Sequence, residues 1–206
     1  MLVSTVIALA KKSELKQLAI KDDDVAIIGF INLGMLALYT RFPLKQEEAI
    51  ITLQTGQAIY PLDGTDANVS MGSADDFLIV SECYDEQGDV VTINDETDPL
   101  GILTPSWNTI EVPNVAQDER LSLIYRSAPA FVTQPTNSIP LPPQLLEALL
   151  NFIGYRGHGT ISSDVKAENN THYMRFDASC KKAEENGMIV IDDLLYTQKF
   201  YDRGFV

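Results

Sequence analysis

The side chains best suited to chemistry in this sequence are two histidines and a nearby glutamate. His172 follows Glu168 by four positions in a polar stretch, and this spacing places both side chains on one face of a helix. A metal site would need a third ligand, for which His158 in the glycine-rich segment 154–159 is the candidate. An exposed Glu–His pair on a helix more often forms only a weak mutual contact. We therefore expect no metal and no cofactor.

Other catalytic signatures are missing from the sequence. It contains no nucleophile elbow, phosphate-binding loop, dinucleotide fingerprint or cysteine pair at metal-ligand spacing. Cys83 and Cys180 are expected to be buried free thiols of a protein made in a reducing cytoplasm. The acidic pairs Asp75-Asp76 and Asp192-Asp193 are typical of solvated loops. The sequence predicts a protein without catalytic residues, and a metal-dependent hydrolase is the most distant alternative.

The charge balance argues against a protein that grips nucleic acid. The 206 residues include 29 acidic and 15 basic side chains, which give a formal charge of −14 at pH 7. Proteins that hold DNA gain most of their affinity from lysine and arginine contacts to phosphates. An acidic surface repels DNA and anionic membranes, but it suits a passage through which DNA slides without sticking. We expect no measurable affinity for duplex DNA.

The sequence predicts no membrane anchor and no secretion signal. Its most apolar segment, residues 25–39, has 15 residues and includes Asn32 and two glycines. A bilayer-spanning helix needs roughly 20 apolar residues. The N-terminal residues lack the basic, apolar and small-residue pattern of a secretory signal. We therefore expect residues 25–39 to form a buried core helix.

The N-terminal part of the sequence predicts two helices. The first is expected over about residues 4–19, with Ser4 or Thr5 as its N-cap. The second is expected over residues 24–41, where the acidic residues 22–24 favour the positive end of the helix dipole. Because the second helix is apolar on nearly every side, other helices and a neighbouring subunit are expected to cover it.

The C-terminal part predicts two more helices. One is expected from about residue 142 to 155, where Gly157 and Gly159 break it. The other is expected over residues 164–186, with Gly187 as its stop. It is strongly polar and is expected on the outside, with a narrow apolar stripe of Val165, Tyr173, Phe176, Cys180 and Ala183.

The middle of the chain changes to the alternating pattern of β-strands. Short strands separated by turns predict a small antiparallel sandwich or barrel, and residues 129–143 hold five prolines that favour an extended return. The predicted fold is α+β: an antiparallel helical bundle of residues 1–46 and 136–187 with an inserted β domain of residues 47–135. The strands are expected over residues 49–53, 58–62, 77–84, 90–93, 109–112 and 121–126.

The last residues, 188–206, are predicted to form an extended C-terminal arm. Apolar and aromatic side chains stand on a polar background, and the segment is too short to bury them against itself. Docking on a partner, by strand addition or by inserting aromatic side chains into a groove, explains this composition, with folding back on the chain's own helices as the alternative. The expected contact residues are Ile189, Ile191, Leu194, Leu195, Tyr196, Phe200, Tyr201 and Phe205.

Several short motifs occur in a characteristic order. Asp23-Asp24 precedes the apolar helix that ends in residues 38–42, and a Tyr60–Asp63 turn, a Thr104–Trp107 segment and a strand over residues 121–125 follow. The chain then returns through residues 139–143 into a helix that contains Tyr155-Arg156. Over about residues 5–187 this arrangement resembles the head–tail connector, or adaptor, proteins of tailed bacteriophages. Adaptors of short-tailed phages with an inserted β domain look most similar.

The resemblance implies a structural virion protein at the portal–tail junction, synthesised in the host cytoplasm. Such adaptors form a ring, usually of twelve subunits, below the portal, and DNA passes through the channel without sequence-specific binding. The helical part would pack side by side, the β domain would meet a tail or nozzle protein, and the arm would reach the portal or a neighbouring subunit. The family brings no catalytic residues. The candidate subunit-interface residues are Phe30, Met35, Tyr39 and Trp107.

The alternative function is that of an accessory protein of the virion. In that case the β domain would be a binding module for a carbohydrate or a receptor. Ring formation in the presence of portal would favour the adaptor, whereas glycan binding by a monomer would favour the accessory protein.

Overall fold

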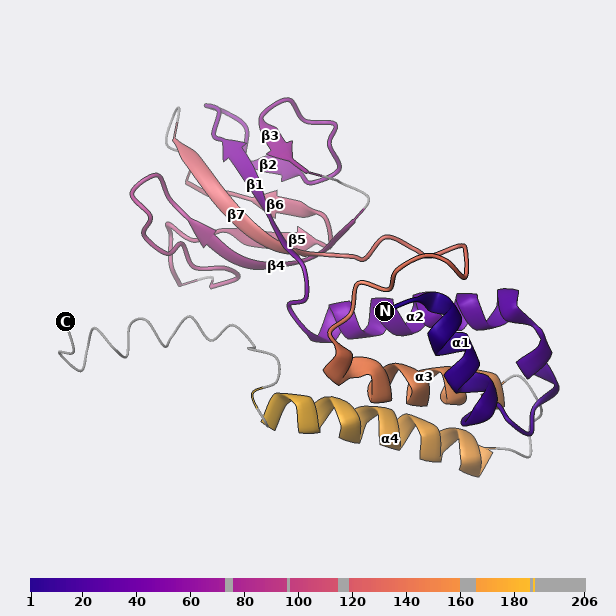
Figure 1. Cartoon of the computed structure of the whole chain (residues 1–206). Helices are drawn as coiled ribbons and strands as arrows, with labels where there is room; N and C mark the ends of the chain where they lie inside the picture. The colour runs from indigo at the N-terminus through magenta and orange to yellow at the C-terminus, as the bar shows by residue number, and fades with distance from the viewer. Residues whose placement is uncertain (73–75, 96, 115–118, 160–165, 186, 188–206) are drawn as a thin grey trace, which may run out of the picture. The chain divides into compact units, whose positions relative to one another are not determined.

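The computed structural model describes residues 1–206 except 73–75, 96, 115–118, 160–165, 186 and 188–206, and of residues 166–170 only the backbone is described (Figure 1). The predicted C-terminal arm and its eight contact residues lie outside the described part. The described residues form four α-helices and two small antiparallel sheets. The predicted α+β class is therefore confirmed.

The chain divides into two compact units. One unit consists of Met1–Pro43 and Phe131–Val206, and the other consists of Leu44–Ala130. The helices belong to the first unit and the strands to the second. The β unit is thus an insertion between the second and third helices of the helical unit.

The helical unit is organised around α3. It contains α1 (Val3–Lys12), α2 (Asp24–Arg41), α3 (Leu146–Gly159) and α4 (Lys166–Glu185), together with the short 3-10 helices η1 (Ala19–Asp22) and η2 (Pro143–Leu145). Helix α3 packs against α2 on one side and α4 on the other, and α1 contacts both α2 and α3 (Figure 1). The α4 stripe is buried at Phe176, Cys180 and Ala183.

Helix α1 is shorter than the sequence predicts, and its expected cap is wrong. It begins after Leu2 and ends at Lys12, and no side chain caps its start. The Val3 and Ser4 N–H groups instead donate to the carbonyls of Asn137 and Pro135, at 3.0 and 2.9 Å. The returning segment thus satisfies the first turn of the helix. Such a partner more than 130 positions away leaves no signal in the local sequence.

Helix α2 begins as the sequence predicts. The Asp23 carboxylate accepts a 3.0 Å hydrogen bond from the Ala26 N–H and caps the helix. Inside the helix, the Asn32 side chain forms two 2.9 Å hydrogen bonds with the backbone N–H and carbonyl of Val132. This pairing accounts for a polar residue in an otherwise apolar helix, because it fastens the returning segment to α2.

Helix α2 is the one described helix that is long and apolar enough to cross a membrane by length and composition. A core helix of a soluble protein meets the same criteria. In this chain, α2 packs against α3 and buries one face in the helical unit. Its buried residues are Ile27, Ile31, Gly34, Met35, Leu38 and Tyr39.

The predicted end of the third helix is wrong, because α3 continues through Gly157 to Gly159. A Cβ atom at Gly157 would lie 2.4 Å from Cδ2 of Leu15, which is fully buried. Glycine at this position therefore allows the close approach of the segment after α1. Its role is packing within a helix, not termination of the helix.

The β unit contains two antiparallel sheets. The larger has the strand order β3 (Val69–Met71), β1 (Gln46–Thr52), β7 (Arg120–Ser127) and β4 (Phe77–Tyr84). The smaller has the order β2 (Ile59–Pro61), β6 (Thr109–Glu111) and β5 (Leu103–Ser106). The expected strand over residues 90–93 is wrong, since this segment forms only isolated bridges at Val90 and Ile93.

One hydrophobic core joins the two sheets of the β unit. The alternating residues Ala49, Ile51 and Leu53 are buried, as the period of a half-buried strand requires. Tyr60 of the smaller sheet and Tyr125 of the larger sheet are both fully buried in this core. Cys83 is also buried there, and burial raises the pKa of its thiol to about 12.

Two glycines of α2 allow a direct test of the α2–α3 packing. A Cβ at Gly34 would lie 2.6 Å from Leu149 Cδ1 and 3.1 Å from Phe152 Cδ1, whereas a Cβ at Gly29 meets nothing within 4 Å. We expect Gly34→Ala to lower the free energy of unfolding by about 1–3 kcal/mol through overpacking. Gly29→Ala is expected to raise it by roughly 0.5–1 kcal/mol through helix propensity. Urea denaturation of the isolated subunit measures both, and equal stabilisation by the two variants would contradict the packing.

The ion pair of Glu47 predicts an acid-sensitive β unit. Lys45 Nζ lies 2.7 Å from Glu47 Oε1 and lowers the pKa of Glu47 below its usual 4.5; burial opposes this shift, and the Tyr125 hydroxyl, which donates at 2.9 Å, adds to it. Because the folded-state pKa is depressed, the stabilisation is complete above pH 4.5 and is lost as the pH falls through the lower folded value. The stability advantage over Glu47→Gln should therefore shrink below pH 4.5. Thermal melts between pH 7 and 3 check this, and an unchanged difference would contradict it.

Candidate functional site

The two histidines that the sequence singled out lie together in the helical unit. The His158 and His172 rings stack with centroids 4.6 Å apart. Glu14 lies beside both, with its carboxylate 3.1 Å from His172 Nδ1 and its backbone oxygen 3.3 Å from His158 Nε2. A Cβ at Gly154 would approach His172 Nδ1 to 2.8 Å, so the glycine leaves room for the imidazole. These contacts fasten the segment after α1 to α3 and α4.

The arrangement differs from the metal site considered for these residues. The Glu168 side chain lies outside the described part, and Glu14, which the sequence did not single out, is the carboxylate beside His172. Among the described residues, no group of three or more His, Cys, Asp or Glu side chains could hold a metal ion. Because Glu14 lies more than 140 positions from both histidines, only the tertiary structure identifies it.

A fork of hydrogen bonds fastens α4 to the end of α2. Arg41 donates from Nε and Nη2 to the two carboxylate oxygens of Glu184, at 2.7 and 3.3 Å, and from Nη1 to Asp177 at 2.7 Å. Glu184 and then Asp177 raise the pKa of Arg41 against the opposing effect of burial. Lys181, 2.8 Å from Asp177, and Arg41 together lower the pKa of Asp177. Arg41, Asp177 and Lys181 are therefore charged at neutral pH.

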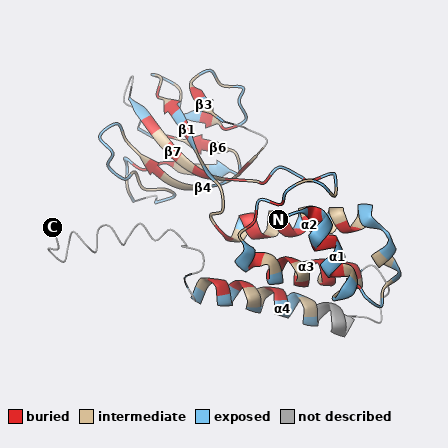
Figure 2. Ribbon diagram, viewed as in Figure 1, coloured by how far each residue is buried: buried red, intermediate tan, exposed pale blue. Residues whose placement is uncertain are grey.

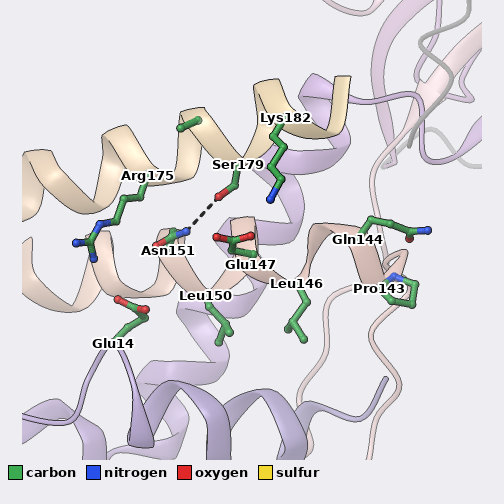
Figure 3. A pocket seen from close by; sticks show the side chains of 11 residues that line it. Glu14, Pro143, Gln144, Leu146, Glu147, Leu150, Asn151, Arg175, Ser179 and Lys182 are labelled. Carbon is green, nitrogen blue, oxygen red and sulfur yellow. Dashed lines mark hydrogen bonds between the residues drawn. The ribbon is translucent and has the colours of Figure 1, made fainter. Parts of the chain in front are cut away.

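A groove of about 760 Å³ lies between α3 and α4 (Figure 3). Pro143 and Gln144 of η2 lie at one end, and Glu14 lies toward the other. Between α3 and α4, the Asn151 amide donates to the Ser179 hydroxyl at 3.3 Å. The remaining lining residues are Leu146, Glu147 and Leu150 of α3 and Arg175, Ala178 and Lys182 of α4.

The groove combines apolar and charged side chains. Leu146 and Leu150 are half-buried along α3, whereas Arg175, Lys182 and Glu147 are exposed. Arg175 and Lys182 are seven residues apart on α4, which corresponds to about 10 Å along the helix. Such a surface can contact an occupant through both apolar and charged side chains.

The comparison with protein families identifies the class of this chain. Residues 2–188 match the model of the SU10 adaptor protein family. The chain belongs to this family. No curated protein matches it. The match covers both compact units of the adaptor and ends at residue 188, so almost all of the predicted arm lies beyond it.

Family membership confirms the predicted resemblance. The adaptor belongs to a family of structural phage proteins, in agreement with the predicted head–tail connector and virion component. The prediction that the chain is not an enzyme is in keeping with such a family. The similarity to adaptors of short-tailed phages in particular stays a prediction.

The structure places the candidate interface residues of the adaptor in different environments. Met35 and Tyr39 are buried inside the helical unit, and the Tyr39 hydroxyl donates to the Pro140 carbonyl at 2.5 Å. Phe30 is half-buried on α2. Trp107 is 70% exposed in the β unit, where its ring lies 6.5 Å from that of Phe77. Of the four, Trp107 is thus the most available to a partner, and the interface role of all four stays a prediction.

Other exposed apolar side chains of the adaptor were not anticipated. On α2, Val25 and Leu33 are 81% and 41% exposed, and Gly29 lies between them at helical spacing. Figure 2 shows that buried and exposed positions alternate along the helices of the helical unit. In the β unit, Ile79 of the edge strand β4 and Trp107 line a hollow of about 300 Å³. The sequence showed α2 to be apolar but could not show which of its faces stays uncovered.

Loss of the Arg41 hydrogen bonds should lower the free energy of unfolding more than loss of the neighbouring Lys181 ion pair. Arg41→Met removes three hydrogen bonds to carboxylates that are only partly exposed, and we expect it to lower the free energy of unfolding by about 1–2 kcal/mol. Lys181→Met, which removes one more exposed ion pair to Asp177, is the control and should have a smaller effect. Urea denaturation measures both variants. Equal effects would show that the fork does not anchor α4.

Proposed function

We propose that this adaptor assembles into a ring beneath the phage portal and links the portal to the tail, with DNA passing through the central channel. The observation that carries the proposal is the match of residues 2–188 to the SU10 adaptor protein family. In the specific form that we propose, a helical bundle forms the wall of the ring. The inserted β sandwich faces tail components, and the C-terminal arm contacts the portal or a neighbouring subunit.

The composition supports a channel that DNA passes through without being held. With a formal charge of −14, the chain lacks the excess of lysine and arginine through which proteins neutralise phosphates. Repulsion between an acidic wall and the DNA backbone keeps the duplex from adhering during its exit. A ring of such subunits therefore suits transit rather than packaging or storage of DNA.

The uncovered face of α2 supports side-by-side packing of the helical units. Val25, Gly29 and Leu33 follow one another at intervals of four and form one exposed stripe. A Cβ at Gly29 would meet nothing within 4 Å, so the backbone there is open to close approach by another helix. Exposed apolar side chains in a row are typical of a surface that a partner covers. We assign this stripe to the contact between subunits.

Assembly with portal tests the proposed function. We expect the isolated adaptor to be monomeric or weakly associated, and to form rings when mixed with the portal protein of the same phage. Native mass spectrometry and negative-stain electron microscopy measure both states. A stable two-fold dimer that portal does not change would contradict the proposal, because a closed dimer uses the surface that a ring requires.

A matched pair of variants tests the α2 stripe. Leu33→Asp should prevent ring formation while leaving the subunit folded, because it places a charge in the proposed contact between subunits. Met174→Asp, at a 71% exposed position on α4, is the control and should leave ring formation unchanged. Circular dichroism confirms folding of both variants. Normal rings from Leu33→Asp would remove the stripe from the interface.

A further inference from the structure

We propose that the hollow beside Trp107 in the β unit receives residues 194–198 from the C-terminal arm of a second copy of the chain. This inference rests on the proposed ring and names the surface that receives the arm. The hollow, of about 300 Å³, is lined by residues of β4 and β5, which are edge strands of the two sheets. Its apolar lining consists of Leu78, Ile79, Val80, Ile93 and Trp107.

Backbone pairing inside the β unit holds one wall of the hollow in place. The Ile102 N–H donates to the Thr92 carbonyl and the Asn94 N–H donates to the Ile102 carbonyl, both at 2.8 Å. Asn94 has a φ of 58°, which asparagine tolerates, and its side-chain oxygen accepts from the Thr104 N–H at 2.8 Å. The hollow is therefore preformed, and an occupant does not have to order it.

The side chains of the hollow favour an apolar occupant. Its polar groups bind one another or a neighbour: the Asn94 amide donates to the Thr104 hydroxyl and the Ser106 hydroxyl to that of Thr109, both at 2.8 Å. Among the described residues, no charged side chain lines it. Ile79 and Trp107 expose apolar surface that an occupant can cover. A carbohydrate would instead need hydrogen-bonding groups directed at it, so the lining fits an apolar peptide better.

The edges of the two sheets resist the addition of a further strand. The pairing of β4 with β7 has two register shifts within residues 77–82. Strand β5 contains Pro105, which has no N–H to donate. Bulges and prolines of this kind blunt an edge against pairing with another chain. The occupant therefore docks by inserting side chains, and not by extending a sheet.

Residues 194–198 are the part of the arm that fits these requirements. The run Leu194-Leu195-Tyr196-Thr197-Gln198 contains no charge and begins with three large apolar side chains. The aromatic residues 200–201, by contrast, stand between Lys199 and Asp202, and the aliphatic residues 188–191 follow α4 almost directly. The seven positions from Gly187 to Leu194 span up to about 25 Å when extended, so residues 194–198 have the reach for another subunit.

Ring geometry favours a second copy as the source of the segment. A closed ring of more than two subunits needs two different, complementary surfaces on each subunit. The hollow and residues 194–198 are different and complementary, and each subunit carries both. Contacts of this kind can follow one another around the whole ring.

Trp107 is the single tryptophan of the chain, so its fluorescence reports on the hollow directly. A peptide of residues 188–206, which contains no tryptophan, should shift the emission of the full-length adaptor to shorter wavelength. Ile79→Asp should weaken this binding roughly tenfold. Ile59→Asp is the matched control, because Ile59 is also an exposed isoleucine on an edge strand but lies outside the hollow. Circular dichroism checks the folding of both variants.

Variant peptides identify the part of the arm that binds. Leu194→Ser combined with Leu195→Ser should abolish the shift, whereas Phe200→Ser combined with Tyr201→Ser should preserve it. Absence of a shift, equal loss with Ile59→Asp, or loss with the second peptide would overturn the proposal. A shift with soluble oligosaccharides of the host surface in place of the peptide would assign the hollow to a glycan and also overturn it.

Disulfide trapping distinguishes a neighbour's segment from the subunit's own. Ser106→Cys subunits mixed with Leu195→Cys subunits should form covalent dimers on oxidation in the presence of portal. The native Cys83 and Cys180 are fully buried and do not compete. A chain carrying both substitutions that yields only cross-linked monomers would assign the hollow to the subunit's own arm and overturn the proposal. Rings without cross-links would also overturn it but leave the proposed function intact, whereas absence of rings would count against the function itself.

Discussion

The close packing of α3 against α2 and α4 is the constraint on which the helical unit depends. Gly34 lets Leu149 and Phe152 of α3 approach the α2 backbone, and Gly157 lets Leu15 approach α3 from another side. Helix α4 is then fastened from outside, by the Arg41 fork at one end and by the contact of Glu14 with His172 at the other. The groove between α3 and α4 exists because these contacts hold both of its walls.

The sequence predicted the classes and the order of the elements because their signals are local. Asp23 caps α2 as its position before an apolar run indicates, and the alternation of Ala49, Ile51 and Leu53 marks a half-buried strand. The wrong predictions depend on distant partners. Helix α1 starts early because the segment at Pro135 and Asn137 accepts its first N–H groups. Gly157 was mistaken for the end of a helix, because a glycine that allows close packing inside a helix looks the same in the sequence as a glycine that ends one.

The candidate site shows the same division between local and distant signals. The sequence identified His158 and His172 as unusual residues, but their partner Glu14 comes from the other end of the chain. Likewise, Leu150 and Arg175 belong to separate predicted helices, and only packing makes them two walls of one groove. The family of the chain was accessible from the order of its motifs, whereas the groove between α3 and α4 became visible only in the tertiary structure.

Because the β unit is inserted between α2 and α3, α2 is translated long before the helix that covers it. About a hundred residues separate the end of α2 from the start of α3, its main packing partner. At synthesis rates of about 5–20 residues per second, the apolar face of α2 emerges roughly 5–20 s before α3 can cover it. The inserted β unit, with its own core, can complete its folding within that interval. During synthesis, the adaptor thus exposes the apolar face of α2 while the β unit is already folded. We therefore expect chaperones that hold apolar segments to bind the nascent chain.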